Sequence, residues 1–162
     1  MLKTLALTLL ITGSVLALAA QNASSIPRIA TELTVLPAAM VPARDRVAIL
    51  GNNVVVTKAV AAKYVVPQKI TEAELLVVED TSHGQFGTTN GGIVVHLHAK
   101  DRLHDLVADY GLRVHHEFGA LPMGVLLPAE RESAGTVVMT LRADERVISA
   151  ILDVNFYQEQ AR

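Results

Sequence analysis

The order of hydrophobic periodicities in residues 91–157 constrains the fold of this chain more than any other feature. Apolar residues recur at every second position in some segments and at every third or fourth position in others, which are the periods of strands and of amphipathic helices. The predicted elements are a strand at 92–98, a helix at 100–110, strands at 112–118 and 123–127, a helix that opens near Pro128 and ends at Asp144 and Glu145, and a strand at 146–152.

Each predicted helix has one apolar stripe. The stripes comprise Leu103, Leu106, Val107 and Tyr110 in the first helix and Ala134, Val137, Val138 and Leu141 in the second, at the i, i+3, i+4, i+7 spacing of a buried helix face. Asp101 is predicted to be either the amino-terminal cap or a first-turn acid of the first helix, and Gly111 stands where a left-handed carboxyl-terminal cap belongs.

This order of elements predicts an α+β fold with a ferredoxin-like split β-α-β-β-α-β arrangement and a four-stranded antiparallel sheet. Both helices then pack on one face of the sheet and leave the other face uncovered. Strict alternation assigns to the uncovered face Val94, His96, His98, Arg113, His115 and Glu117, and assigns His116 to the core side.

Residues 20–90 predict no single architecture, and we interpret them as an irregular or mixed extension. Apolar runs at 46–50 and 54–57 are joined by Gly-Asn-Asn, a composition typical of a hairpin turn. The runs at 60–66 and 75–78 fit a helix and a strand equally well. Residues 81–92 contain four glycines among polar residues and are interpreted as a linker.

Residues 1–19 have the features of a signal peptide. Lys3 precedes an apolar run that ends at Leu18, and Ala17 and Ala19 give the small-x-small pattern of a cleavage site. The run is shorter than the roughly 20 apolar residues of a membrane span, so an uncleaved anchor is the less favoured alternative. We therefore expect a protein exported to the periplasm or the medium, without membrane contact after cleavage.

Composition narrows the possible partners. The chain has no cysteine, so it has no disulfides, which favours a bacterial exported protein over a small secreted eukaryotic one. The net charge is −2 with mixed signs, aromatic residues make up 4% and tryptophan is absent. These properties predict no nucleic-acid partner.

Three segments resemble parts of one known protein family. Residues 91–95 (Gly-Gly-Ile-Val-Val) look like the first strand of the subtilisin-propeptide family of peptidase inhibitors. Residues 109–114 are similar to the junction between its first helix and second strand, and residues 141–147 to the junction between its second helix and last strand. The resemblance covers residues 91–157, so residues 91–162 are interpreted as a propeptide-like domain with a carboxyl-terminal tail.

The resemblance implies a binding protein that inhibits a subtilisin-like serine protease, assists its folding, or does both. The uncovered sheet face would pack on the protease, and the tail would pair with the substrate cleft by strand addition. The tail comprises Asn155, Phe156, Tyr157, Gln158, Glu159, Gln160, Ala161 and Arg162. As the last residue of a separate polypeptide, Arg162 would enter the first specificity pocket, and the free protein would be a monomer.

An alternative interpretation is an exported structural or metal-binding module that uses His96 and His98. A metal site needs three or four converging ligands, and one intervening strand would separate His96 from His115 by about 10 Å. We therefore predict no metal and no cofactor, and expect solvated or interface histidines that make binding pH-dependent.

Asp80, Ser82 and His83 are close in sequence, but catalysis requires convergence in space, and we predict no enzyme.

Overall fold

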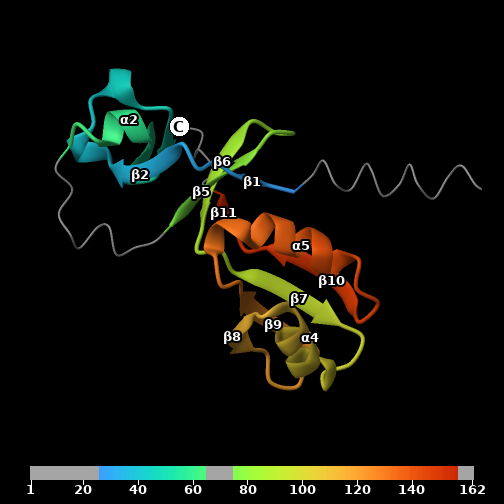
Figure 1. Cartoon of the computed structure of the whole chain (residues 1–162). Helices are drawn as coiled ribbons and strands as arrows, with labels where there is room; N and C mark the ends of the chain where they lie inside the picture. Colours follow the sequence, from blue (N-terminus) through green and yellow to red (C-terminus); the bar gives the residue numbers. More distant parts are fainter. Residues whose placement is uncertain (1–25, 65–74, 157–162) are drawn as a thin grey trace, which may run out of the picture.

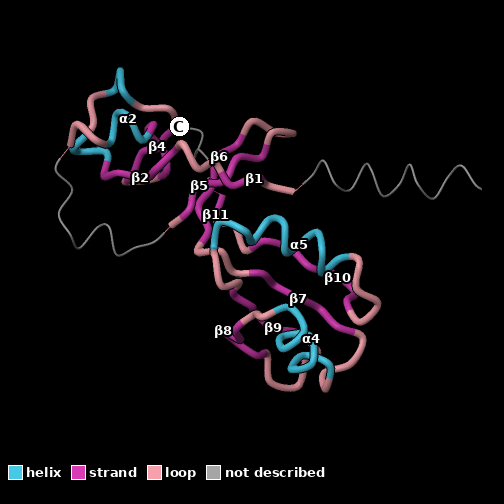
Figure 2. The backbone as a smooth tube through the Cα atoms, viewed as in Figure 1, coloured by secondary structure: helices cyan, strands magenta, loops and turns pink. Residues whose placement is uncertain are grey.

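The computed structural model describes residues 26–64 and 75–156, which form a mixed α+β structure with three antiparallel sheets. Figure 1 shows the sheets in sequence colours, and Figure 2 separates helices, strands and loops. The predicted signal peptide lies outside the described residues. The described part contains no helix of the length and apolarity needed to cross a membrane.

The first sheet has the order β2-β4-β3. Its strands are β2 (Leu33–Pro37), β3 (Ala48–Leu50) and β4 (Asn53–Thr57). The predicted hairpin between β3 and β4 is confirmed by their antiparallel pairing, and Gly51 at the turn has a φ of 59°, a left-handed conformation that glycine adopts without strain. Two short 3₁₀ helices, η1 (Ala38–Met40) and η2 (Ala43–Asp45), connect β2 to β3.

The run at 60–66, which fitted a helix or a strand, begins inside a short helix, α2 (Lys58–Ala61). The Thr57 hydroxyl caps this helix by accepting a hydrogen bond from the Val60 amide at 3.2 Å, as threonine commonly does at this position. Residues 65 and 66 lie outside the described part.

The second sheet has the order β1-β5-β6-β11. Its strands are β1 (Arg28–Ile29), β5 (Leu76–Asp80), β6 (Gln85–Thr89) and β11 (Asn155–Phe156). The linker interpretation of residues 81–92 was wrong, because β6 lies within it and pairs with β5 over five residues. Glycine and threonine suggested a loop, whereas the paired backbone of β5 and the close approach of β11 favour a strand.

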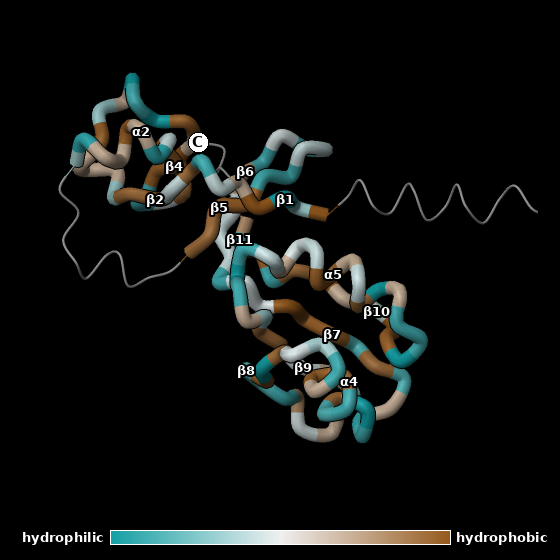
Figure 3. The backbone as a smooth tube through the Cα atoms, in the orientation of Figure 1, coloured by the Kyte–Doolittle hydropathy of each residue, from teal (hydrophilic) through white to brown (hydrophobic). Residues whose placement is uncertain are grey.

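Strand β5 contributes to two hydrophobic cores. Val77 packs with Leu50 and Val55 of the first sheet, whereas Val78 packs in the core of residues 91–154. Successive side chains of a strand point to opposite faces, so one strand can fill both cores. Figure 3 shows hydrophobic residues along β5 and β7.

The third sheet has the order β10-β7-β9-β8, with every neighbouring pair antiparallel. Its strands and helices, in chain order, are β7 (Ile93–Leu97), α4 (Arg102–Tyr110), β8 (Arg113–Glu117), β9 (Met123–Leu127), α5 (Ala134–Arg142) and β10 (Val147–Leu152). The four predicted strands and two predicted helices of this part are therefore present in the predicted order.

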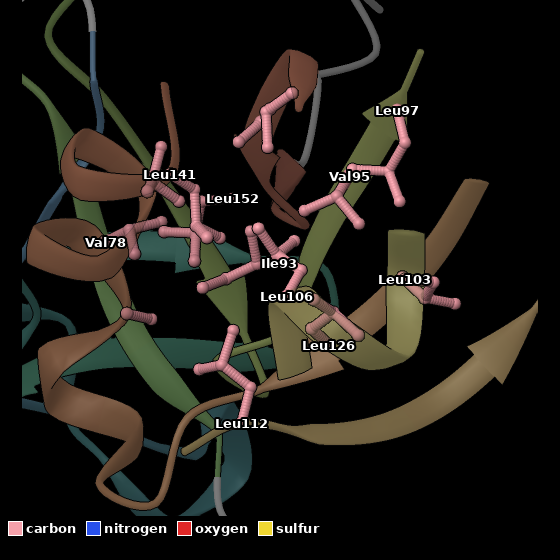
Figure 4. Close-up of a cluster of buried hydrophobic side chains, with 14 residues drawn as sticks. Val78, Ile93, Val95, Leu97, Leu103, Leu106, Leu112, Leu126, Leu141 and Leu152 are labelled. Atoms are coloured by element: carbon pink, nitrogen blue, oxygen red, sulfur yellow. The ribbon is translucent and has the colours of Figure 1, made fainter. Parts of the chain in front are cut away.

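Helices α4 and α5 lie on the same side of this sheet. Leu103 and Leu106 of α4 and Ala134, Val138 and Leu141 of α5 are buried in one core with Ile93, Val95 and Leu97 of β7. Figure 4 labels the leucines of both helices and the three residues of β7 in this core. The predicted stripes of both helices are confirmed, and the sequence spacing alone sufficed to find them.

The helix ends differ partly from expectation. Gly111 caps α4 in the left-handed conformation, with a φ of 60°, as predicted. Asp101 makes no side-chain cap hydrogen bond. Pro128 does not open the second helix, because a 3₁₀ turn (η3, Arg131–Ser133) precedes α5.

A polar cluster joins the end of α4 to the turn between α5 and β10. The Tyr110 hydroxyl donates to Asp144 Oδ2 at 2.9 Å, and Arg146 Nη2 donates to the same oxygen at 2.7 Å. Arg146 Nη1 also donates to Asp109 Oδ2 at 2.7 Å. The Arg146 guanidinium holds the pKa of Asp144 well below its usual range. Two of the three segments that carry the family resemblance, residues 109–114 and 141–147, therefore meet in this cluster.

We predict that Val78→Ala destabilises both halves of the chain. Val78 is fully buried in one core, and its strand, β5, fills the other core through Val77. The expected loss is about 1–3 kcal/mol of unfolding free energy. Hydrogen exchange followed by mass spectrometry should show faster exchange in both β4 and β7. The control is Val47→Ala at a position with 48% exposure; acceleration confined to β7 would contradict the shared role of β5.

Candidate functional site

The side of the third sheet that faces away from α4 and α5 carries a regular grid of side chains, which we call the open face. Strand pairing places its members in two complete rows. The rows are Ile151, Val94, Val125 and His116, and Ser149, His96, Met123 and Phe118. A third row at the sheet's edge contains Leu127 beside Arg113.

Much of the open face is apolar and accessible. Ile151 is 51% exposed and Phe118 is 38% exposed, and Val94 and Met123 are half-buried. None of these four residues belongs to a hydrophobic core of the described residues. The face is therefore an apolar sheet surface that no other described part of the chain covers, a feature that commonly marks an interaction site.

Three predicted face residues lie on the open face or at its margin. Val94 and His96 belong to its rows through their pairing with β9 and β10. Arg113 is exposed at the β8 edge opposite Leu127. His98 follows the end of β7 and is exposed, and its amide donates to Arg146 O at 3.0 Å.

A β-bulge in β8 overturns the assignment of Glu117. Val114 is opposite Leu126, but His116 is opposite Val125, so His115 is the extra residue. One extra residue reverses the faces of all side chains that follow it. Glu117 therefore points to the helix side, where its Oε1 lies 3.4 Å from His104 Nε2, and the prediction that it lies on the uncovered face was wrong.

The same bulge brings His116, which strict alternation had placed on the core side, to the open face together with Phe118. Their rings are in edge-to-face contact, with centroids 4.9 Å apart. Val114 is left 37% exposed on the helix side of the edge strand. Neither the bulge nor its position has a sequence signal, because no glycine or proline interrupts residues 113–117.

The first two residues of the predicted tail are paired within the chain. Asn155 and Phe156 form β11, opposite Thr88 and Gly87 of β6. The Thr89 hydroxyl also donates to Asp153 O at 2.5 Å, which fixes the backbone just before β11. The remaining predicted tail residues, Tyr157, Gln158, Glu159, Gln160, Ala161 and Arg162, lie outside the described residues.

Gly87 makes the close approach of β11 possible. A Cβ atom at this position would lie 2.7 Å from Val154 Cγ1 and 2.9 Å from the Asn155 carbonyl oxygen. The second contact is with backbone, so a larger residue displaces β11 or distorts β6. The glycine that suggested a linker in the sequence is thus a packing requirement of the sheet.

We predict that Gly87→Ala loosens β11, with faster amide exchange at residues 155 and 156 and a loss of about 1–3 kcal/mol of unfolding free energy. The matched control is Gly135→Ala. A Cβ at Gly135 meets nothing within 4 Å, and alanine should stabilise α5 by about 1 kcal/mol. Unchanged exchange at residues 155 and 156 in Gly87→Ala would contradict the packing role of this glycine.

Asp80, Ser82 and His83 do meet in space, at the turn between β5 and β6. Ser82 Oγ lies 2.5 Å from Asp80 Oδ1 and 2.9 Å from His83 Nδ1, and His83 Nδ1 lies 2.7 Å from Asp80 Oδ2. A catalytic triad uses the two different ring nitrogens of histidine for the acid and for the nucleophile. Here Nδ1 contacts both, so the arrangement caps a turn and lacks the relay geometry.

We predict that Ser82→Ala raises the pKa of Asp80. Hydrogen bonds from Ser82 and then from His83 hold this pKa at about 2, below its ordinary value. The folded state therefore gains stability from this carboxylate above about pH 4, and loses it as the pH falls toward 2. Carbon NMR titration of the Asp80 carboxyl measures the pKa shift, with Thr81→Ala as the control. A titration midpoint in Ser82→Ala equal to that of the control would contradict the prediction.

Within residues 26–64 and 75–156 no group of three or more His, Asp or Glu side chains could hold a metal ion. His96 and His116 lie in different rows of the open face on strands separated by β9. The metal-binding alternative therefore gains no support from the described histidines.

Comparison of this chain with protein-family models, with curated proteins and with solved structures gave no match. The open face and the carboxyl-terminal strand β11 are consequently the features from which function is inferred.

Proposed function

We propose that this chain is an exported protein that binds a subtilisin-like serine protease through its open face, and so inhibits the protease, assists its folding, or does both. The observation that carries the proposal is the apolar open face, on which Ile151 is 51% exposed and no helix of residues 26–64 and 75–156 packs. An exposed apolar face of this kind is a liability in a protein with no partner.

The finer fold assignment is part of the proposal. We infer that residues 91–157 have the ferredoxin-like split β-α-β-β-α-β arrangement implied by the resemblance. The strand order β10-β7-β9-β8 and the placement of α4 and α5 on one face support this assignment. The meeting of two segments that carry the resemblance in the cluster of Tyr110, Asp144 and Arg146 supports it further.

The size of the open face indicates that a second contact is needed. Four strands about 4.8 Å apart and five residues long cover roughly 300 Å² in plane, whereas a stable interface buries about 800 Å² on each partner. The carboxyl-terminal segment is the natural second contact. Because Asn155 and Phe156 pair with β6, we propose that the cleft takes residues 157–162, which would span about 20 Å if extended.

Strand addition in the cleft supplies main-chain hydrogen bonds, and side chains supply specificity. Under this proposal β6 holds the start of the tail while the open face holds the protease surface. Residues 26–90 then act as the support of the tail, which gives the amino-terminal half a role in binding.

We predict that Ile151→Glu weakens inhibition of subtilisin-type proteases at least about tenfold, because it places a charge in an apolar interface. The matched control is Met139→Glu on α5, at a residue that is 42% exposed; it should leave inhibition within about twofold. Residual protease activity over a range of inhibitor concentrations gives the inhibition constants, and circular dichroism verifies folding.

Two further measurements complete this test. A chain that lacks residues 157–162 should inhibit less well, and refolding of a denatured protease with and without the protein measures chaperone activity. Absence of inhibition and of assisted refolding across a panel of subtilisin-type proteases would overturn the proposed function. Inhibition unaffected by the deletion would remove only the tail from it.

A further inference from the structure

The charges of the open face are distributed unevenly. The described side chains of its two complete rows include two histidines and no carboxylate, and Arg113 is exposed at the β8 edge. One acidic residue on this side is Asp153, which follows β10 and whose amide donates to Gly92 O at 2.8 Å. Strands β8 and β10 are the opposite edges of the sheet, so Asp153 and Arg113 lie at opposite ends of the third row.

The bulge at His115 creates this distribution. Without it, Glu117 would share the face with Arg113, and His116 would point toward the helices. With it, Glu117 is paired with His104 on the helix side, and His116 stands beside Phe118 on the open face. The bulge therefore removes the only carboxylate of β8 from the binding surface and adds an imidazole.

We propose that the open face is built for a protein surface with an apolar centre and carboxylates at the position that meets β8. Ile151, Val94 and Met123 form the apolar part, and Arg113 with His116 forms the basic edge. This inference rests on the proposed function and specifies the chemistry of the protease surface that is bound.

A second copy of this chain fits the face less well. In a symmetric pair of open faces, Asp153 could match Arg113 at most, because the two complete rows, which hold His96 and His116, contain no carboxylate. Like charges brought together across an interface oppose binding. An acidic partner surface satisfies both the apolar rows and the basic edge.

The test compares Arg113→Glu with Arg102→Glu, which makes the same change in net charge on α4. Arg102 is 57% exposed and lies 3.7 Å from Asp105, on the helix side of the sheet. The probe is the subtilisin-type protease most strongly inhibited in the assay above. Association and dissociation rates are measured at about 25 mM NaCl, where charge screening is weak, and at about 500 mM NaCl, where it is strong.

We expect Arg113→Glu to weaken affinity by about tenfold or more at low salt, mainly through slower association, and by less than about threefold at high salt. Arg102→Glu should stay within about twofold at both, and Arg113→Lys should retain binding. Equal effects of the two charge reversals, with wild-type binding intact, would overturn this inference and leave the proposed function standing. Absence of wild-type binding to every protease in the panel would overturn both.

Discussion

The two-sided burial of β5 is the constraint on which the rest of this structure depends. Val77 fills a core with the first sheet, and Val78 fills the core beneath α4 and α5. Because the two side chains are neighbours on one strand and point to opposite faces, the placement of β5 contributes to both cores at once. The position of β5 also fixes β6, and β6 in turn pairs with β11 through the space left by Gly87. The amino-terminal half is therefore a structural part of the same unit and the support of the carboxyl-terminal strand.

One added residue in β8 determines the chemistry of the open face. The bulge at His115 reverses the sides on which His116 and Glu117 lie. Glu117 consequently pairs with His104 on the helix side, and the uncovered side gains a histidine in contact with Phe118. A local change in backbone register thus converts a mixed surface into an apolar surface with a basic edge. Such a surface has the properties expected of an interaction site.

The geometry of Asp80, Ser82 and His83 is that of a hydrogen-bonded turn and lacks the relay of a catalytic triad. The three side chains are within hydrogen-bonding distance, yet one imidazole nitrogen serves both partners. The cluster is also at the exposed end of a hairpin. Its hydrogen bonds lower the pKa of Asp80 to about 2 and close the turn between β5 and β6. Proximity of catalytic residue types is therefore insufficient evidence for an enzyme.

The sequence by itself determined the order of strands and helices from β7 to β10, because the stripes of α4 and α5 and the alternation of β7 depend only on local periodicity. It also determined the β3–β4 hairpin and the left-handed cap at Gly111. Only the tertiary structure decided that residues 85–89 are a strand, that β8 is bulged and that Asn155 and Phe156 pair with β6. These features depend on contacts between residues far apart in the chain. At Gly87 the absence of a side chain is decisive, because it leaves space for β11. Periodicity shows which side of an element is buried, whereas register and close approach are set by the partner strand.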